Sequence, residues 1–197
     1  MTNIIQVNTP TGRLYETPVG LLPSVTTILK ATMPVQQQKR LQKSSLSGAA
    51  SRGTKIHELI AAQLSGQPQD CPEELLEFWN PVRKIVAALT NPVAIECAVY
   101  HPTLRYAGTL DLIANWQDRL TIFDWKTSYR AKRLESMGSA AIQVAAYKAA
   151  FEQLFEIEVE QAAIVVISPN RVQLFEIDIA QSWDAWLQRL EAYYTSP

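Results

Sequence analysis

The chain has 197 residues, enough to bury one sizeable hydrophobic core but too few for two comfortable domains. With 47% hydrophobic and 19% charged residues it has an ordinary globular composition, and its net charge of −1 excludes a globally basic nucleic-acid-binding protein. A nucleic-acid site would need local positive charge instead. The chain start lacks a secretory signal and no apolar run is long enough to span a bilayer, so we expect a cytoplasmic protein without a membrane partner.

The first part of the chain predicts an arm followed by helices. Residues 1–35 contain many prolines and glycines, and we expect them to form an irregular or strand-containing N-terminal arm. A short helix is expected to begin after the N-cap Ser24. Residues 36–64 are expected to be helical in two pieces, the first polar and basic, the second with an apolar stripe at helical spacing. Another helix follows Pro72, and Pro81 is expected to kink or split it.

The second part predicts a sheet with helices around it. β-branched and aromatic residues indicate strands, and Gln117-Asp118 has the pattern of a tight hairpin turn. The expected elements are strands at 93–100, 107–116 and 119–125, a helix at about 136–155, strands at 160–168 and 171–178, and a helix at 180–194. This order predicts an α/β (α+β) fold with a central mixed sheet flanked by helices.

Two carboxylates stand in the apolar strands of the predicted hairpin. If 117–118 form the turn, Asp111 lies opposite or nearly opposite Asp124, and strand alternation places Lys126 on the same side as Asp124. Carboxylates this close repel each other unless a divalent cation lies between them, and oxygen ligands favour Mg²⁺ or Mn²⁺ over zinc. Lys126 could then orient or activate a water molecule or neutralise a phosphate. Taken alone, the tripeptide with Asp124 and Lys126 favours an exposed ion pair at a strand end.

Four other residues are candidate members of the same site. His57 lies beside the apolar stripe of its helix and could ligate Mn²⁺, although a lone histidine there is more often a packed or surface residue. Glu96 could face the metal side of the sheet or, equally well, solvent. Gln143 and Tyr147 are one helical turn apart and share a face, where they could support Lys126, hold a phosphate or simply mark the helix boundary.

Five short motifs occur together in a recognisable order. They are G-T-K-I-H (53–57), I-E (95–96), A-G-T-L-D (107–111), D-W-K-T (124–127) and Q-V-A-A-Y (143–147). Their order and spacing resemble the RecB-like branch of the PD-(D/E)XK nuclease superfamily. Three longer segments, 22–29, 96–111 and 183–193, are similar to the mitochondrial genome maintenance exonuclease family and its bacterial and phage relatives. This likeness covers nearly the whole chain from about residue 14, and we expect a bacterial or phage protein because a mitochondrial presequence is missing.

The resemblance implies a single nuclease domain over 1–197 that hydrolyses phosphodiester bonds of single-stranded DNA from a free end. It implies one or two Mg²⁺ or Mn²⁺ ions, whose ligands would be His57, Asp111, Asp124 and the backbone carbonyl of Trp125. The catalytic residues would be Lys126, Asp111, Asp124, Glu96, Gln143 and Tyr147. No iron–sulfur cluster is expected, because the two cysteines, Cys71 and Cys97, fall short of the four that some relatives use.

The resemblance also implies where DNA binds. The polar segment 36–50 is the candidate for a helical arch over the active site. DNA contacts are assigned to Ser24, Lys39, Arg40, Lys43, Thr127, Tyr129 and Arg130. The residues from Tyr129 onward could equally be an ordinary solvated loop. Candidate substrates include flaps and duplex ends, and replication or repair proteins could recruit the enzyme. The alternatives are a structure-specific endonuclease with the same metal centre, a non-catalytic DNA-binding module, and a scaffold whose acidic hairpin is incidental.

Overall fold

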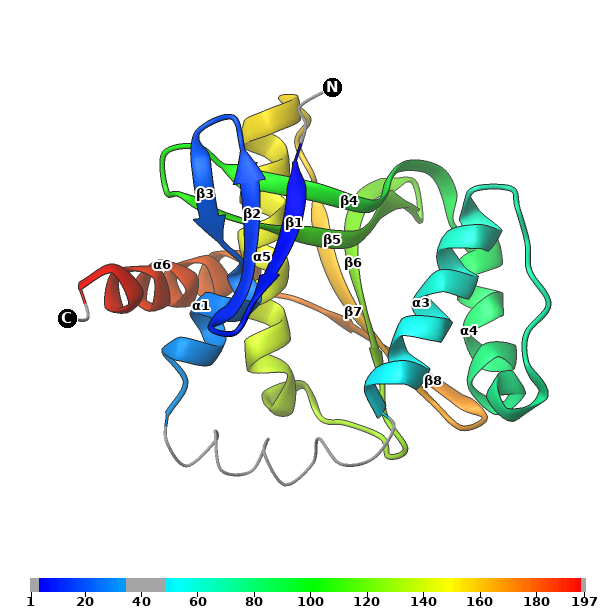
Figure 1. The fold of residues 1–197 in the computed structure, drawn as a ribbon. Helices are drawn as coiled ribbons and strands as arrows, with labels where there is room; N and C mark the ends of the chain where they lie inside the picture. The colour runs from blue at the N-terminus through cyan, green and yellow to red at the C-terminus, as the bar shows by residue number, and fades with distance from the viewer. Residues whose placement is uncertain (1–3, 35–48, 196–197) are drawn as a thin grey trace.

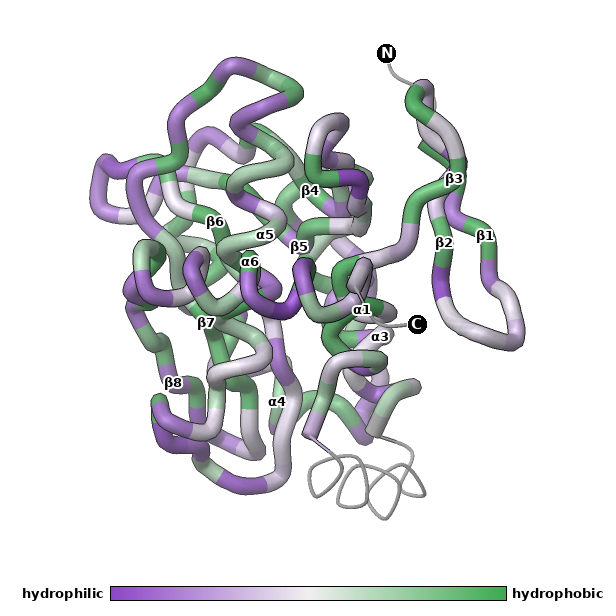
Figure 2. Tube along the Cα trace, turned by 90° about the vertical axis from the view of Figure 1, so that its left-hand side faces the viewer, coloured by the Kyte–Doolittle hydropathy of each residue, from purple (hydrophilic) through white to green (hydrophobic). Residues whose placement is uncertain are grey.

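A small antiparallel sheet forms the N-terminal arm. The computed structural model describes residues 4–34 and 49–195. The arm contains β1 (Ile5–Thr9), β2 (Gly12–Thr17) and β3 (Gly20–Pro23) in the order β1-β2-β3, followed by α1 (Val25–Ala31). The strand-containing arm and the helix start are confirmed, because the Ser24 hydroxyl accepts a hydrogen bond from the Thr27 backbone N–H as an N-cap does. The arm stands beside the main body of the molecule (Figures 1 and 2).

A five-stranded mixed sheet is the centre of the fold. Its strands are β4 (Thr90–His101), β5 (Tyr106–Trp116), β6 (Arg119–Thr127), β7 (Gln161–Ser168) and β8 (Arg171–Glu176), paired in chain order. Only β6 and β7 run parallel, which confirms the predicted mixed sheet. The predicted tight turn is also confirmed: Trp116 pairs with Arg119, and Gln117 and Asp118 have φ of 51° and 63°. Two positive φ values are the signature of a type I′ hairpin.

Helices cover both faces of this sheet (Figure 1). Besides α1, they are α3 (Ala49–Leu64), the 3₁₀ turn η1 (Glu73–Leu75), α4 (Leu76–Ala88), the 3₁₀ turn η2 (Leu134–Met137), α5 (Gly138–Phe155) and α6 (Ile179–Thr195). α3 ends where Ser65-Gly66 predicted a stop, and α4 continues through Pro81 without being split. The first predicted helical piece of 36–64 lies outside the described residues. Among the described helices, none combines the length and apolar character needed to cross a membrane.

Two apolar cores lie on opposite faces of the sheet. Along β7, Ile164 and Val166 pack into the core formed with α1, α5 and α6, whereas Val165 and Ile167 pack into the core formed with α3 and α4. Such a strand is buried on both sides, which explains its continuous hydrophobic run. Figure 2 shows the hydrophobic stretches in the sheet and the helices packed on it, with hydrophilic stretches mostly in the peripheral loops.

The strands β5 and β6 separate before either of them ends. Their antiparallel ladder stops at the pair Leu112 and Phe123. Beyond that pair β5 stays with β4, while β6 continues to Thr127 beside β7. The two carboxylates predicted to face each other, Asp111 and Asp124, come directly after this point. The separation therefore opens the sheet at the acidic residues and leaves room for other groups to approach them.

Candidate active site

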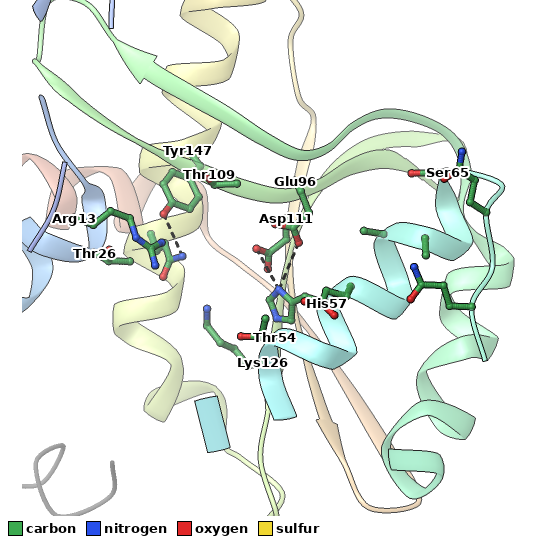
Figure 3. Close-up of a pocket in the computed structure, with 16 residues that line it drawn as sticks. Arg13, Thr26, Thr54, His57, Ser65, Glu96, Thr109, Asp111, Lys126 and Tyr147 are labelled. Atoms are coloured by element: carbon green, nitrogen blue, oxygen red, sulfur yellow. Dashed lines mark hydrogen bonds and ion pairs between the residues drawn. The ribbon is translucent and has the colours of Figure 1, made fainter. Parts of the chain in front are cut away.

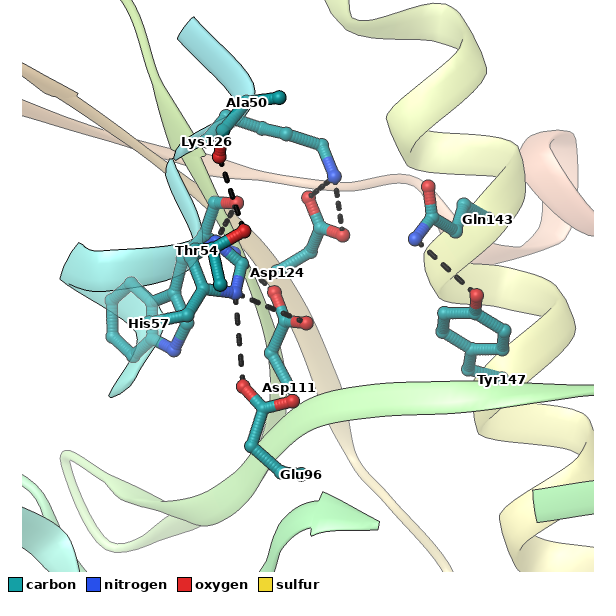
Figure 4. A network of polar contacts seen from close by, with 10 residues as sticks. Ala50, Thr54, His57, Glu96, Asp111, Asp124, Lys126, Gln143 and Tyr147 are labelled. Atoms are coloured by element: carbon teal, nitrogen blue, oxygen red, sulfur yellow. Dashed lines mark hydrogen bonds and ion pairs between the residues drawn. The ribbon is translucent and has the colours of Figure 1, made fainter. Parts of the chain in front are cut away.

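The two carboxylates of the hairpin meet different partners (Figure 4). Asp111 accepts a hydrogen bond through Oδ2 from the backbone N–H of Trp125, at 2.8 Å. Both carboxylate oxygens of Asp124 contact the Lys126 ammonium, at 2.8 and 2.7 Å. The predicted alternation along β6 is confirmed, because Trp125 points the other way into the core with α3 and α4. The lysine thus neutralises Asp124 and leaves Asp111 to other partners.

His57 reaches the site from α3. The neighbouring residues Ile56 and Ile60 are buried against the sheet, so the next position on the helix, His57, faces the opening between β5 and β6. Its Nε2 lies 2.9 Å from the carbonyl oxygen of Trp125. Its Nδ1 lies 3.6 Å from Asp111 Oδ1 and 3.7 Å from Glu96 Oε1. The helix histidine therefore stands between the main chain of one strand and the carboxylates of two others.

Glu96 enters the site through an irregular backbone. Its φ of 44° is a left-handed conformation within the strand β4, where a non-glycine residue costs on the order of 1–3 kcal/mol. The ladder pairs Ile95 with Leu112 and Cys97 with Leu110, but Glu96 and Asp111 between them do not pair. The strained residue therefore lies opposite Asp111, and its carboxylate turns toward His57. Such strain persists only where surrounding structure compensates for it, and it concentrates at functional sites.

These groups fit a divalent cation. One ligand atom from each of His57, Glu96 and Asp111 can be chosen so that all three lie within 4.8 Å of one another. Burial, followed by the charge of Asp124, raises the pKa of Asp111 to about 7. Burial lowers the pKa of His57, but the carboxylates of Glu96 and Asp111 outweigh it and raise the pKa overall. Crowded carboxylates of this kind are stabilised by positive charge, and an imidazole nitrogen with carboxylate oxygens is a donor set that can ligate a divalent cation.

Lys126 is held in its charged form. Burial lowers the pKa of its ammonium, but the charges of Asp124 and Asp111 outweigh burial and raise the pKa above its usual value. The side chain keeps 37% of its surface exposed, so the ammonium remains within reach of a molecule in the pocket. A protonated lysine donates hydrogen bonds and does not accept protons. Its charge suits the stabilisation or orientation of an anion.

Gln143 and Tyr147 form the wall of the site on α5. The Gln143 amide donates to the Tyr147 hydroxyl at 3.4 Å. The Tyr147 ring lies against β5 at Gly108, where a Cβ atom would come within 2.3 Å of ring carbon Cε1. The glycine of the A-G-T-L-D motif therefore has a steric role, because it admits the tyrosine ring to the face of the strand.

The close approach at Gly108 predicts the effect of adding one methyl group. The substitution Gly108→Ala should displace the Tyr147 ring and destabilise the protein by about 1–3 kcal/mol, the usual range for overpacking. The measurement is the midpoint of denaturant unfolding. Combining Gly108→Ala with Tyr147→Ala should cost less than the sum of the single substitutions, because the alanine at 147 removes the ring that clashes. Additive losses in the double variant would show that Gly108 is not required by Tyr147.

A pocket of about 610 Å³ collects most of the candidate residues (Figure 3). The lining residues that the sequence predicted for the site are His57, Glu96, Asp111, Lys126, Gln143 and Tyr147. Asp124 and Trp125 lie behind the pocket wall, in contact with Lys126 and His57 respectively. The structure thus gathers residues from α3, β4, β5, β6 and α5 around one opening.

The residues predicted to contact DNA differ in how far they are exposed to solvent. Ser24 is 1% exposed and its hydroxyl caps α1, so it has a structural role, and its contact with DNA stays a prediction. Tyr129 is 64% exposed, with its ring packed over the Arg52 guanidinium at 4.2 Å. Arg130 is exposed and Thr127 is half-buried at the end of β6. The other predicted contacts, Lys39, Arg40 and Lys43, lie outside the described residues.

Several pocket residues were not among the site residues predicted from the sequence. Thr109 precedes Asp111 by two positions on β5, so strand alternation could have placed both on one face. Glu58 is adjacent to His57 and lines the pocket from the same helix. Arg13 also lines the pocket but comes from the N-terminal arm, where no local pattern links it to the carboxylates. Only the packing of the arm against the sheet brings Arg13 there.

Comparison with known proteins identifies the family. The model of the PD-(D/E)XK nuclease superfamily matches residues 35–194. Mitochondrial genome maintenance exonuclease 1 from Homo sapiens is 32% identical over 201 residues, which cover 88% of this chain and 58% of the relative. The proteins of the same name from Xenopus tropicalis and Mus musculus are 29% and 28% identical, over 88% and 87% of this chain and 58% and 59% of the relatives. This chain therefore spans less than two thirds of the length of these relatives. With four fifths of its sequence inside the family match, the chain belongs to the PD-(D/E)XK nuclease superfamily.

Proposed function

We propose that this protein is a Mg²⁺- or Mn²⁺-dependent deoxyribonuclease that hydrolyses single-stranded DNA from a free end. The observation that carries the proposal is the cluster of His57, Glu96 and Asp111, whose ligand atoms lie within 4.8 Å of one another. Lys126 opens into the same pocket, where its ammonium can meet a phosphate. A cation site beside a charged donor is the arrangement that phosphodiester hydrolysis requires.

The proposed ligands differ in whether a lysine neutralises them in this structure. His57, Asp111 and the carbonyl of Trp125 lie together at the opening, and Glu96 adds a second carboxylate. Asp124, the fourth proposed ligand, is held by Lys126 in this structure. When bound here, a divalent cation supplies Lewis acidity, which polarises the scissile phosphate and makes water a better nucleophile.

The protein's own groups orient the substrate. The Lys126 ammonium, charged because of its acidic neighbours, donates hydrogen bonds to a phosphate oxygen or positions the attacking water. Gln143 and Tyr147 present an amide and a hydroxyl on the opposite wall, where they hold the same phosphate or the lysine. Tyr129 offers an exposed ring on which a base of the strand can stack, with Arg130 beside it.

Action from a free end is proposed from the similarity to proteins named exonucleases and from the polar segment 36–50. A strand that passes beneath an arch at this segment must enter by its end. Lys39, Arg40 and Lys43 in the segment would hold the phosphates of the entering strand through contacts that weaken with salt. The segment directly precedes α3 in the chain, and α3 carries the site residue His57.

One experiment tests each part of this proposal. Linear and circular single-stranded DNA of the same sequence are incubated with the protein in Mg²⁺, in Mn²⁺ and in excess chelator. We expect degradation of the linear strand only when a divalent cation is present, and an intact circle in all three conditions. Cleavage at full rate in chelator would contradict the metal site. Efficient cutting of the circle would instead identify an endonuclease with the same centre.

A further inference from the structure

At one end of the pocket lies a charged residue that the nuclease motifs do not contain. Arg13 on β2 of the N-terminal arm lines this end, together with Thr26, Thr109, Gln143 and Tyr147 (Figure 3). The acidic lining residues, Glu58, Glu96 and Asp111, belong to the other end around His57. The family match begins at residue 35, so the arm and its arginine lie outside it. The cationic group at this end of the pocket therefore comes from a segment outside the family match.

Strand alternation directs the Arg13 side chain toward the sheet. Tyr15, two residues later on β2, is 1% exposed and lies against β5, where its hydroxyl is 2.9 Å from Thr109 Oγ1. Residues i and i+2 of a strand share a face, so Arg13 points to the same side as Tyr15. Because Tyr15 is packed beside the pocket wall, the guanidinium is carried to the pocket itself.

The backbone of Arg13 is held firmly. Its N–H donates to Thr27 Oγ1 at 3.0 Å, and its carbonyl accepts from the Thr27 hydroxyl at 2.9 Å and from the Ser24 N–H at 3.0 Å. The preceding residue, Gly12, has a φ of 145°, and a Cβ there would come within 2.8 Å of Thr27. Glycine permits this close approach, so the start of β2 is tied to α1 at a defined position.

The guanidinium has no partner to neutralise it within the described part of the chain: no ion pair or side-chain hydrogen bond involves it. The groups that line this end are hydroxyls and an amide, none of them a carboxylate. Arg13 and Tyr147 lie beside each other in the pocket (Figure 3). An exposed, unpaired arginine whose backbone is held in place, among neutral donors, can receive an anion from outside.

We propose that Arg13, with Thr26 and Gln143, binds a phosphate of the substrate strand next to the scissile one. A guanidinium presents a rigid fork of donors that matches two oxygens of a phosphate, and the hydroxyl and amide supply further donors. The subsite rests on the proposed function, since a strand lying in the pocket would place one phosphate at the His57 end and another at Arg13. The bound group is an internal phosphodiester or the terminal phosphate of the strand.

Three variants test the subsite by binding, without any need for turnover. Affinity for a labelled single-stranded oligonucleotide is measured in chelator for Arg13→Ala, Arg13→Lys and Arg83→Ala. Arg83 is an exposed arginine on α4 outside the pocket lining, so Arg83→Ala is a control that removes the same charge elsewhere. We expect Arg13→Ala to bind about tenfold more weakly, the scale of one charge-assisted hydrogen bond, and its salt slope to fall by about 0.7. Arg13→Lys should be intermediate, because lysine keeps the charge but loses the fork.

A second arm identifies the phosphate. Neutral methylphosphonate is placed at each linkage of the oligonucleotide in turn, and the 5′ end is tested with and without a phosphate. In the wild type, methylphosphonate at one linkage should weaken binding strongly. In Arg13→Ala, methylphosphonate at that linkage should leave the affinity unchanged. Sensitivity at a linkage identifies a diester, and sensitivity only at the end identifies a terminal phosphate.

The outcomes separate this subsite from the proposed function. If the wild type cleaves DNA but Arg13→Ala and Arg83→Ala bind equally well and respond alike to every methylphosphonate, the subsite is wrong and the nuclease stands. If the wild type cleaves no nucleic acid with any metal, the proposed function is wrong, whereas loss of oligonucleotide binding in Arg13→Ala would still support the phosphate subsite. Equal melting temperatures of the variants and the wild type exclude unfolding as the cause.

Discussion

Replacing Lys126 with alanine should lower the rate of DNA cleavage by about 10²–10³-fold while leaving the affinity for DNA nearly unchanged. The ammonium is charged and opens into the pocket beside the proposed cation site, so its contribution is expected at the reacting phosphate or the water. Binding is distributed over many phosphate contacts, of which this is one. Single-turnover cleavage and equilibrium binding, measured on the same oligonucleotide, separate the two effects.

The same substitution has a structural consequence that needs its own control. Without the ammonium, the buried carboxylate of Asp124 loses its partner, so metal-free Lys126→Ala should melt at a lower temperature than the wild type. Lys126→Arg keeps the charge and should restore most of the stability without restoring the rate. Lys84→Ala, which removes an exposed lysine on α4, should change neither property. Near-normal turnover of either Lys126 variant would remove the lysine from the mechanism.

Replacing Asp111 with asparagine should stabilise the metal-free protein at pH 8. Burial and the nearby Asp124 raise the pKa of Asp111 to about 7, so its ionised form is disfavoured in the folded state. Asparagine has a similar size, can still accept the hydrogen bond from Trp125 and carries no charge. We expect a gain on the order of a few kcal/mol in the free energy of unfolding. For a domain of this size each kcal/mol corresponds to about 2–4 °C in Tm.

The stabilisation expected for Asp111→Asn depends on pH. Between pH 3.8 and about 7 the folded protein retains a proton on Asp111 that the unfolded chain has released. The free energy of unfolding of the wild type should therefore fall as the pH rises through this window and level off above it. Asparagine cannot ionise, so the difference between variant and wild type should vanish near pH 4 and grow toward pH 8. Thermal unfolding in chelator across this range measures it.

Two matched variants and one ligand make the test of Asp111 specific. Asp118→Asn removes an exposed charge from the turn of the same hairpin, where asparagine tolerates the positive φ, and should leave Tm unchanged. Asp124→Asn should not stabilise, because it strips Lys126 of its partner. Mn²⁺ should raise the Tm of the wild type but not of Asp111→Asn. Equal stabilisation of both by Mn²⁺ would mean that the metal binds elsewhere.

Local patterns predicted a large part of this molecule. The turn at Gln117-Asp118 and the cap at Ser24 depend on neighbouring residues, and the structure contains both. The strand β7, read from its apolar run at 160–168, appears at Gln161–Ser168 because burial on both faces favours such residues. The alternation that places Asp124 and Lys126 together follows from the geometry of one strand. These features rest on short-range interactions, which a sequence displays directly.

The sequence by itself determined the order of the elements, the hairpin and the set of residues that carry charge or could ligate a metal. Only the tertiary structure decided how those residues meet. The separation of β5 from β6 follows from their pairing with different strands, and it lets His57 enter from α3. The unusual backbone of Glu96 and the arrival of Arg13 from the arm likewise depend on contacts between distant segments. Such contacts arise when whole surfaces pack together, and no local spacing in the sequence encodes them.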